Sequence, residues 1–525
     1  MTRQKRLTLV ACILGSGIVF VDQTVVNVAL PAIRRDLHAG LATQQWVVEA
    51  YLLTLGSLLL VGGSLSDLFG RRRIFALGLA GFGVTSILCA VAPTSALLAG
   101  ARALQGATGA LLVPSALAVI VAAFNEDERG AAIGTWTAWA GISTIIGPLL
   151  GGLLIQASSW RLVFAINLLP IALAIYLVIR HVPQTLDETQ HRHIDILGAV
   201  LCAAGLAGVV TAVIEEPTHS FGNLLVGPLL AVGVVCLTLF LAQEMRSPDP
   251  MLPLALFRRR NFAVGNASTL LVYAALGGST FFISVYLQQV AGYRPVDAGL
   301  ALLPVTLLMF VLSRRFGALA DRLGPRLFMG VGPLVAGVGL LWFVRLGAHV
   351  SYVKDVLPGA VVFALGLSIT VAPLTAAVLA GVDDHHAGIA SGVNNAVARV
   401  AGLLAIAGVG AVVAGQFGST LDSKLQGVRL DAVSSHAVVI ARSRPLTSAP
   451  RGVNAAGRSA IRAASVDAFR AGMLASAVLS MLGGAISAVG ILNPRRRVAA
   501  GECPGGALVG ASRRVGRILT APSRS

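Results

Sequence analysis

The chain has 525 residues, of which 56% are hydrophobic and only 12% are charged, and its mean hydropathy is +0.81. Ordinary soluble domains are far less apolar, so the composition predicts a protein embedded in a lipid bilayer. The net charge of +17 does not indicate a nucleic-acid partner, because the basic residues are spread over short segments between apolar runs and form no single soluble face.

Fourteen apolar segments follow one another along the chain, and each is close to or above the ~20 residues that a membrane-spanning helix needs. In chain order the predicted spans are 7–31, 44–66, 73–93, 96–123, 130–155, 162–180, 194–214, 222–243, 261–287, 296–316, 326–346, 355–380, 388–413 and 468–493. The chain is therefore predicted to be an all-α polytopic membrane protein with 14 transmembrane helices.

Two similar polar turns, GSLSDLFGRR at 63–72 and GALADRLGPR at 317–326, each lie between two apolar runs. Such a repeat indicates two related helical bundles, and the spacing leaves room for one extra hairpin between them. The predicted organisation is an N-terminal six-helix bundle at 1–180, a central two-helix insertion at 194–243, a cytoplasmic linker at 244–260, a C-terminal six-helix bundle at 261–493 with a long extracytoplasmic loop at 414–467, and a basic cytoplasmic tail at 494–525.

The distribution of positive charge predicts the orientation in the membrane. With fourteen spans both termini lie on the same side, and the short segments on that side carry 20 Lys and Arg residues, against six on the opposite side. Because positive charge is retained in the cytoplasm, both termini are predicted to be cytoplasmic, in a multi-pass protein of the cytoplasmic membrane.

Cofactor motifs are absent from the sequence. The five cysteines are scattered and four lie in apolar runs, so no metal site or disulfide is predicted from them. The string DDHH at 383–386 carries metal-ligand side chains, but its place in a short turn favours a solvated loop. The sequence has no Gly-Lys-Ser/Thr phosphate loop, so transport driven by an ion gradient is favoured over transport driven by ATP. We expect a monomer with no cofactor, no metal and no nucleic acid.

Ionisable side chains within the spans are the strongest functional signals, because a charge in hydrocarbon is costly. Asp22 in the first span and Arg102 in the fourth can lie at similar depth and pair with each other. The pair is either a structural link between helices or a proton-coupling site, and the second interpretation is favoured. Glu49 lies in the outer part of the second span, where its side chain could reach the surface.

Other features of the spans remain open to two interpretations. The fifth span contains a proline and several glycines: Gly141, Gly147, Pro148, Gly151 and Gly152. The proline can bend the helix while the glycines let a neighbouring helix slide along it, or the glycines can serve close helix packing alone. The polar residues that could line a cavity are Asn27, Glu49, Gln288, Asn394, Asn395 and Arg399.

Five motifs together resemble the major facilitator superfamily, and within it the 14-helix drug:proton antiporters of the EmrB/QacA type. They are VDQTVVNVALP at 21–31, GSLSDLFGRRR at 63–73, RALQGATGA at 102–110, GISTIIGPLLGG at 141–152 and GIASGVNNAVARVAG at 388–402. The resemblance covers about 7–413 and a last helix, and leaves 414–467 and the tail without a motif.

The resemblance implies roles for individual residues. Asp22 would be the protonatable group and Arg102 its charge partner, while the Gly147-Pro148 bend would limit proton leak. A cytoplasmic latch between the halves, favouring the outward-open state, would be formed by Asp67, Arg71 and Arg72, with a weaker second copy in Asp321 and Arg322. Some relatives that export dications have an acid within the tenth span. Here that span offers only Asp297 near its end, so dication export is not expected.

The expected function is proton-coupled export of lipophilic drugs, antibiotics or a secreted metabolite across the cytoplasmic membrane. A uniporter or symporter of the same fold for a dedicated small molecule is the alternative. An enzyme or receptor is not expected, because the sequence carries no nucleophile motif, His-rich metal site or signalling domain.

Overall fold

The computed structural model describes residues 2–38, 40–183, 195–219, 225–248, 250, 252, 254–379, 384–428, 430–442, 444–450 and 452–493. Every regular element in these ranges is a helix. The predicted basic tail at 494–525 lies outside the described residues, as do the side chains of the string at 383–386.

The first half of the chain forms one helical bundle. Its helices are α1 (Arg3–Asp36), α2 (Leu41–Phe69), α3 (Arg71–Val91), α4 (Ser95–Ala123), α5 (Glu126–Ala157), α6 (Leu162–Ala165) and α7 (Leu168–His181). Capping hydrogen bonds and a glycine define several of the helix ends. The hydroxyls of Thr2 and Thr94 cap α1 and α4 by accepting backbone N–H bonds. Gly70 separates α2 from α3 at φ +95°, a conformation that glycine adopts without strain.

The second half repeats this plan after a helical hairpin. The hairpin consists of α8 (Ile196–His219) and α9 (Val226–Arg246), and the short helix η1 (Leu254–Arg258) follows it. The C-terminal bundle contains α10 (Arg260–Gln289), α11 (Pro295–Ala301), α12 (Leu303–Leu323), α13 (Pro325–Phe343), η2 (Tyr352–Val356), α14 (Leu357–Leu379), α15 (Asp384–Leu425), α16 (Ala432–Arg442) and α17 (Ala455–Gly490). Gly324, at φ +87°, occupies the place of Gly70 in the second copy of the repeated turn.

The number of spans agrees with the sequence prediction. Within the described residues, twelve helical segments are long and apolar enough to cross a membrane, and α6–α7 and α11–α12 each count as one. Helices α2 and α5, with 29 and 32 residues, complete the fourteen predicted spans. The all-α polytopic fold is confirmed.

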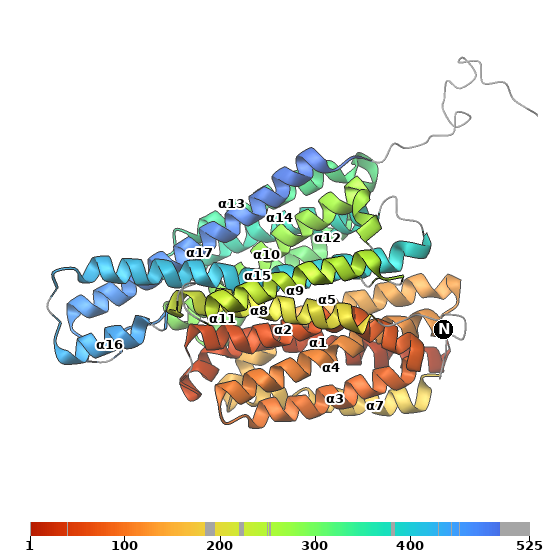
Figure 1. Cartoon of the computed structure of the whole chain (residues 1–525), viewed down its shortest axis with the longest axis horizontal. Coiled ribbons are helices and arrows are strands. Elements are labelled where there is room, and N and C mark those ends of the chain that lie inside the picture. Colours follow the sequence, from red (N-terminus) through yellow and green to blue (C-terminus); the bar gives the residue numbers. More distant parts are fainter. Residues whose placement is uncertain are drawn as a thin grey trace, which may run out of the picture.

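The loop predicted at 414–467 is wrong for most of its length. Helix α15 continues to Leu425, α16 covers Ala432–Arg442, and α17 begins at Ala455. The segment is rich in alanine, the best helix former, and α16 buries Ala437, Val438 and Ala441. Its Ser and Arg content indicated a loop, but Arg442, Arg458 and Arg462 lie on the exposed faces of amphipathic helices. Ser434 and Ser465 are buried within the helical packing. Figure 1 shows this region projecting beyond the bundle at the end opposite the N-terminus.

The contacts between the two bundles include α1 with α10 and α11, α2 with α15, and α5 with α11 and α12. Gln45 of α2 donates to the carbonyl of Ile406 in α15 at 2.7 Å. Ser284 of α10 donates to the carbonyl of Asn27 in α1 at 3.3 Å. Since α1 ends and α2 begins at the end opposite the N-terminus (Figure 1), these contacts lie toward that end of the molecule. We call this contact region the seam.

The hairpin α8–α9 covers one side of the seam. Helix α8 packs against α2 and α15, whereas α9 packs against α8. Only 17% of the most apolar 18-residue stretch of α9 is buried. This helix therefore lies at the periphery. The two helices approach closely because Gly208 and Gly233 face each other.

This close approach makes a prediction about stability. A Cβ on Gly233 would lie 2.6 Å from the backbone nitrogen of Val209 and 2.9 Å from the carbonyl carbon of Gly208. We expect Gly233→Ala to destabilise the protein by about 1–3 kcal/mol, because backbone atoms cannot move aside cheaply. A melting curve of the purified protein in detergent measures the effect.

The matched control is Gly418→Ala in α15, where nothing lies within 4 Å of the added Cβ. Alanine is about 0.8–1 kcal/mol more favourable than glycine in a helix, so this variant should melt at the same or a higher temperature. Equal melting temperatures for the two variants would contradict the hairpin packing.

Candidate functional site

Asp22 of α1 and Arg102 of α4 form a buried ion pair inside the N-terminal bundle. Nη1 of Arg102 donates to Oδ2 of Asp22, and the two side chains are 1% and 0% exposed, respectively. The structure therefore brings together the two charges that the sequence placed at similar depth. Each charge offsets part of the desolvation cost of the other.

Three neutral polar side chains surround the carboxylate of Asp22, and sequence reasoning missed all of them. Gln105 donates to Oδ1 of Asp22 at 3.1 Å and to Ser86 at 2.9 Å. Asn167 donates to the same Oδ1 at 3.0 Å and to Ser86 at 3.3 Å. All three are buried. Gln105 lies one helical turn after Arg102 in the motif RALQGATGA, which is the signal that could have found it.

Arg102 is held from several sides. Its Nε donates to the carbonyl of Val47 at 3.0 Å, and Nη1 also donates to Gln105 at 2.7 Å. The guanidinium carbon lies 4.1 Å from the ring centroid of Tyr51 and 5.7 Å from that of Phe164. Aromatic faces stabilise a cation in a poorly hydrated site. The guanidinium thus keeps several partners besides Asp22.

This arrangement suits a group that gains and loses a proton. As a carboxylate, Asp22 accepts hydrogen bonds from Arg102, Gln105 and Asn167. A proton on Asp22 would remove its charge and weaken the bond that it accepts from the Arg102 guanidinium. Val47, Gln105 and the aromatic rings would still hold Arg102 in place. The two protonation states therefore differ in how α1 is tied to α4 and α7.

The glycine and proline residues of α5 pack against both halves. Gly147 lies against Thr24 and Gly151 against Val25, both in α1, and Gly152 faces the backbone of Val296 in α11. The carbonyl of Pro148 lies 2.6 Å from where a Cβ on Gly299 would be. Close packing at the seam is therefore one role of this motif. The side-chain surroundings of position 141 are outside the described part, so Gly141 stays a prediction.

The predicted latch is described only in part. The side chains of Asp67 and Asp321 lie outside the described residues, so the latch itself remains a prediction. Arg72 donates to the carbonyl of Ile179 at 2.7 Å, and Arg322 is exposed. Arg71 is partly buried at the start of α3.

The candidate cavity residues do not form one cluster. Asn394 accepts a hydrogen bond from Thr269 at 2.7 Å, Asn395 is exposed, and Arg399 lies against Gly56 of α2. Gln288 donates to Ser284 at 3.3 Å, and Ser284 in turn donates to the carbonyl of Asn27. Asn27 and Gln288 are thus neighbours across the seam.

The expectation that Glu49 reaches the surface is wrong. Its side chain is 0% exposed and neither carboxyl oxygen has a hydrogen-bond partner among the described residues. Glu49 lies one turn after Gln45 on α2, on the face that contacts α15. The other half of the molecule buries this face, and a single segment of sequence contains no information about that contact.

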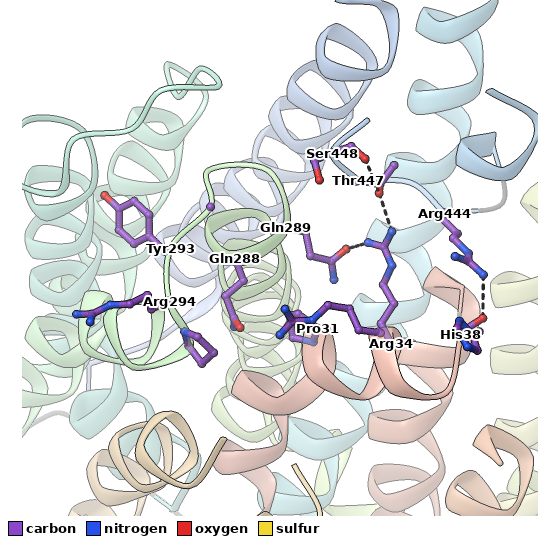
Figure 2. A pocket seen from close by; sticks show the side chains of 13 residues that line it. Pro31, Arg34, His38, Gln288, Gln289, Tyr293, Arg294, Arg444, Thr447 and Ser448 are labelled. Atoms are coloured by element: carbon purple, nitrogen blue, oxygen red, sulfur yellow. Dashed lines mark hydrogen bonds between the residues drawn. The ribbon is translucent and has the colours of Figure 1, made fainter. Parts of the chain in front are cut away.

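A polar pocket lies at the end of the seam opposite the N-terminus. Its volume is about 590 Å³, within the range of small-molecule sites. Its lining comes from the end of α1, the end of α10 with the segment that leads into α11, and the segment after α16 (Figure 2). Five of its residues are basic: Arg34, Arg35, His38, Arg294 and Arg444.

An apolar groove of about 720 Å³ runs between α10, α15 and α17 and includes Leu270, Ala405 and Val478 in its lining. Nothing polar converges on it. Within the described residues, no three His, Cys, Asp or Glu side chains gather as metal ligands.

A family model described as Major Facilitator Superfamily matches residues 12–406. The chain belongs to the major facilitator superfamily. The match covers the N-terminal bundle, the hairpin and the C-terminal bundle as far as the middle of α15, and it includes Asp22, Arg102, Gln105 and Asn167.

Curated members of the superfamily align with most of the chain. The multidrug resistance protein Stp of Mycobacterium tuberculosis (strain CDC 1551 / Oshkosh) is 35% identical over 437 residues, covering 83% of this chain and 81% of the relative. The tetracenomycin C resistance and export protein of Streptomyces glaucescens is 35% identical over 429 residues, covering 79% and 77%. The puromycin resistance protein pur8 of Streptomyces alboniger is 38% identical over 406 residues, covering 76% and 80%.

Solved structures share the fold. A bacterial homologue of the human lysosomal transporter Spinster, in an inward-facing and unoccupied conformation, matches with a TM-score of 0.66 and 16% identity, covering 93% of this chain and 97% of that one. The peptide transporter POT in complex with sulfate matches with a TM-score of 0.57 and 15% identity, covering 78% and 91%.

The cluster around Asp22 makes a prediction about stability. Gln105→Leu keeps the side-chain volume but removes one hydrogen-bond partner from each of Asp22, Arg102 and Ser86. Because an unsatisfied buried polar group costs about 1–3 kcal/mol, we expect a clear fall in melting temperature. The control is Gln416→Leu, since Gln416 is exposed and its side chain bonds only Thr420. A comparable fall in melting temperature in both variants would contradict the role of Gln105 in stabilising the cluster around Asp22.

Proposed function

We propose that this superfamily member is a proton-coupled efflux transporter that exports lipophilic drugs, antibiotics or a secreted metabolite by alternating access. The observation that carries the proposal is the fully buried Asp22–Arg102 pair and its shell of amide and hydroxyl groups. Ionisable groups within membrane spans are rare and mark ion pathways. The relatives support the direction of transport, since their names refer to resistance and export.

In this proposal Asp22 carries the proton. Proton binding from outside would weaken the link from α1 to α4, and proton release to the cytoplasm would restore it. Arg102 assists release, because a nearby cation favours the carboxylate. The chain's own residues suffice for this cycle, so no cofactor, metal or nucleic acid enters it, and a monomer is sufficient.

Alternating access requires the two bundles to rock against each other. The seam between them consists of helix contacts, and the glycines of α5 let α1 and α11 approach closely. The proposed latch would act at the opposite end. There Asp67 would face the positive N-terminal end of a helix from the other half, which the sequence suggests is α15, with Arg71, Arg72, Asp321 and Arg322 as further members.

The orientation follows from charge in this proposal. Positive residues gather on the side of the termini, so both termini are placed in the cytoplasm, and the seam would be closed toward the exterior. A uniporter or symporter for a dedicated small molecule is not favoured, because the relatives carry resistance and export names.

The test of proton coupling is Asp22→Asn. Asparagine keeps the shape of the side chain but cannot exchange a proton at neutral pH. We expect export driven by a pH gradient to fall to the background of empty liposomes, while the protein still inserts and elutes as a folded species. Dye and antibiotic flux in proteoliposomes with an imposed pH gradient is the measurement.

Asp36→Asn is the matched control, at the exposed end of the same helix. Asp36 pairs with Arg161 at 2.5 Å, and its side chain is 47% exposed. This variant should transport at the unmodified rate. Undiminished pH-driven export by the Asp22→Asn variant would rule out Asp22 as the coupling acid.

A further inference from the structure

The pocket at the outer end of the seam carries positive charge that the described residues do not neutralise. Its lining contains four arginines, one histidine and no carboxylate. Asp36, which follows Arg35 in the sequence, pairs with Arg161, and Asp422 pairs with Arg442. Arg294 is neutralised by Asp297, which accepts from it at 2.7 and 3.1 Å. Arg34, Arg35 and Arg444 therefore stand without an ion pair in the described part of the chain.

Arg34 lies at the centre of this group (Figure 2). Its two Nη atoms donate to Gln289 and, at 2.6 Å, to the hydroxyl of Thr447. Both acceptors are neutral, so the bonds fix the guanidinium in place without balancing its charge. Arg35 and Arg444 act on it as like charges. A half-buried cation among like charges is unfavourable unless an anion joins it.

Arg444 is also held in position. It donates to the carbonyl of His38 at 3.0 Å, at the end of α1, and Figure 2 shows it on the same side of the pocket as Arg34 and Thr447. Two guanidinium groups from segments more than 400 residues apart are thus fixed beside one cavity. Further donors, Ser448 and Gln288, line the same space.

We propose that this pocket is a binding site for an oxyanion, a phosphate or carboxylate group, bridged by Arg34 and Arg444. Guanidinium groups match the planar, two-oxygen face of such anions and bind them by paired hydrogen bonds. The cavity is large enough for more than a bare ion, so the anion is either free or part of a lipid headgroup. This site is independent of Asp22, which lies inside the N-terminal bundle.

The anion would also join the two halves. Arg34 belongs to α1 of the first half, whereas Thr447 and Arg444 belong to the segment that leads into α17 of the second. Separation of the bundles at this end would pull these residues apart. An anion that binds only the closed seam therefore shifts the equilibrium toward the closed state.

The experiment measures binding of two defined probes to the full chain. In detergent, the melting temperature is followed while inorganic phosphate replaces chloride at constant ionic strength, since a ligand of the folded state raises it saturably. In nanodiscs, native mass spectrometry counts phosphatidylglycerol molecules retained against a phosphatidylcholine background. The variants are Arg34→Gln and Arg444→Gln, tested singly, because glutamine keeps a donor and removes the charge. The control is Arg345→Gln, an exposed arginine that stacks on Trp342 outside the pocket.

We expect each pocket variant to weaken binding about tenfold or more, as the loss of a charge-assisted hydrogen bond implies, and the control to bind as the unmodified protein does. Loss of phosphate binding identifies a free anion as a ligand, and loss of retained phosphatidylglycerol identifies a lipid headgroup. Binding that is equal in all four proteins, or absent for both probes in the unmodified protein, overturns the proposal. Either result leaves the Asp22→Asn test unaffected.

Discussion

The interaction on which the rest of the structure depends is the ion pair between Asp22 and Arg102. A bilayer offers no water to solvate a charge, so the pair needs a shell of donors and acceptors to persist there. Gln105, Asn167 and Ser86 supply that shell from α4, α7 and α3. The pair therefore fixes the packing of four helices at once, and the N-terminal bundle is organised around a polar centre.

The seam between the bundles follows a different principle. Hydrogen bonds such as Gln45–Ile406 and Ser284–Asn27 cross it toward one end, and its closest contacts place glycine against backbone, as at Gly152 and Val296. Surfaces of this kind gain van der Waals contact when closed and leave few buried polar groups unpaired when they separate. Rigid polar packing inside a bundle and smooth packing between bundles are the properties that a rocking motion requires. Glu49 is the exception, because it buries at the seam a carboxyl group that has no hydrogen-bond partner among the described residues.

Much of this architecture could be predicted from sequence, because hydropathy reports directly on membrane spans. Asp22 and Arg102 were also predictable, since a charge in an apolar run is rare and costly. Gln105, Ser86 and Asn167 were not, because neutral polar residues occur in many spans and only their convergence gives them a role. Glu49 was misread for a related reason: its burial comes from α15, more than 330 residues away. The error at 414–467 has another origin, since Ser and Arg suit both loops and the exposed faces of helices.

The two polar centres of the molecule differ in their charge balance. Around Asp22, one acid and one base are matched and buried, so the pair needs no further ion for charge balance. At the end of the seam opposite the N-terminus, Arg34 and Arg444 are fixed by neutral partners, and no described acid pairs with them. Two carboxylates on the same segments, Asp36 and Asp297, are paired with other arginines. In the proposed mechanism the balanced centre inside one bundle exchanges the proton, whereas the unbalanced centre between the bundles binds an anion and makes closure of the seam depend on it.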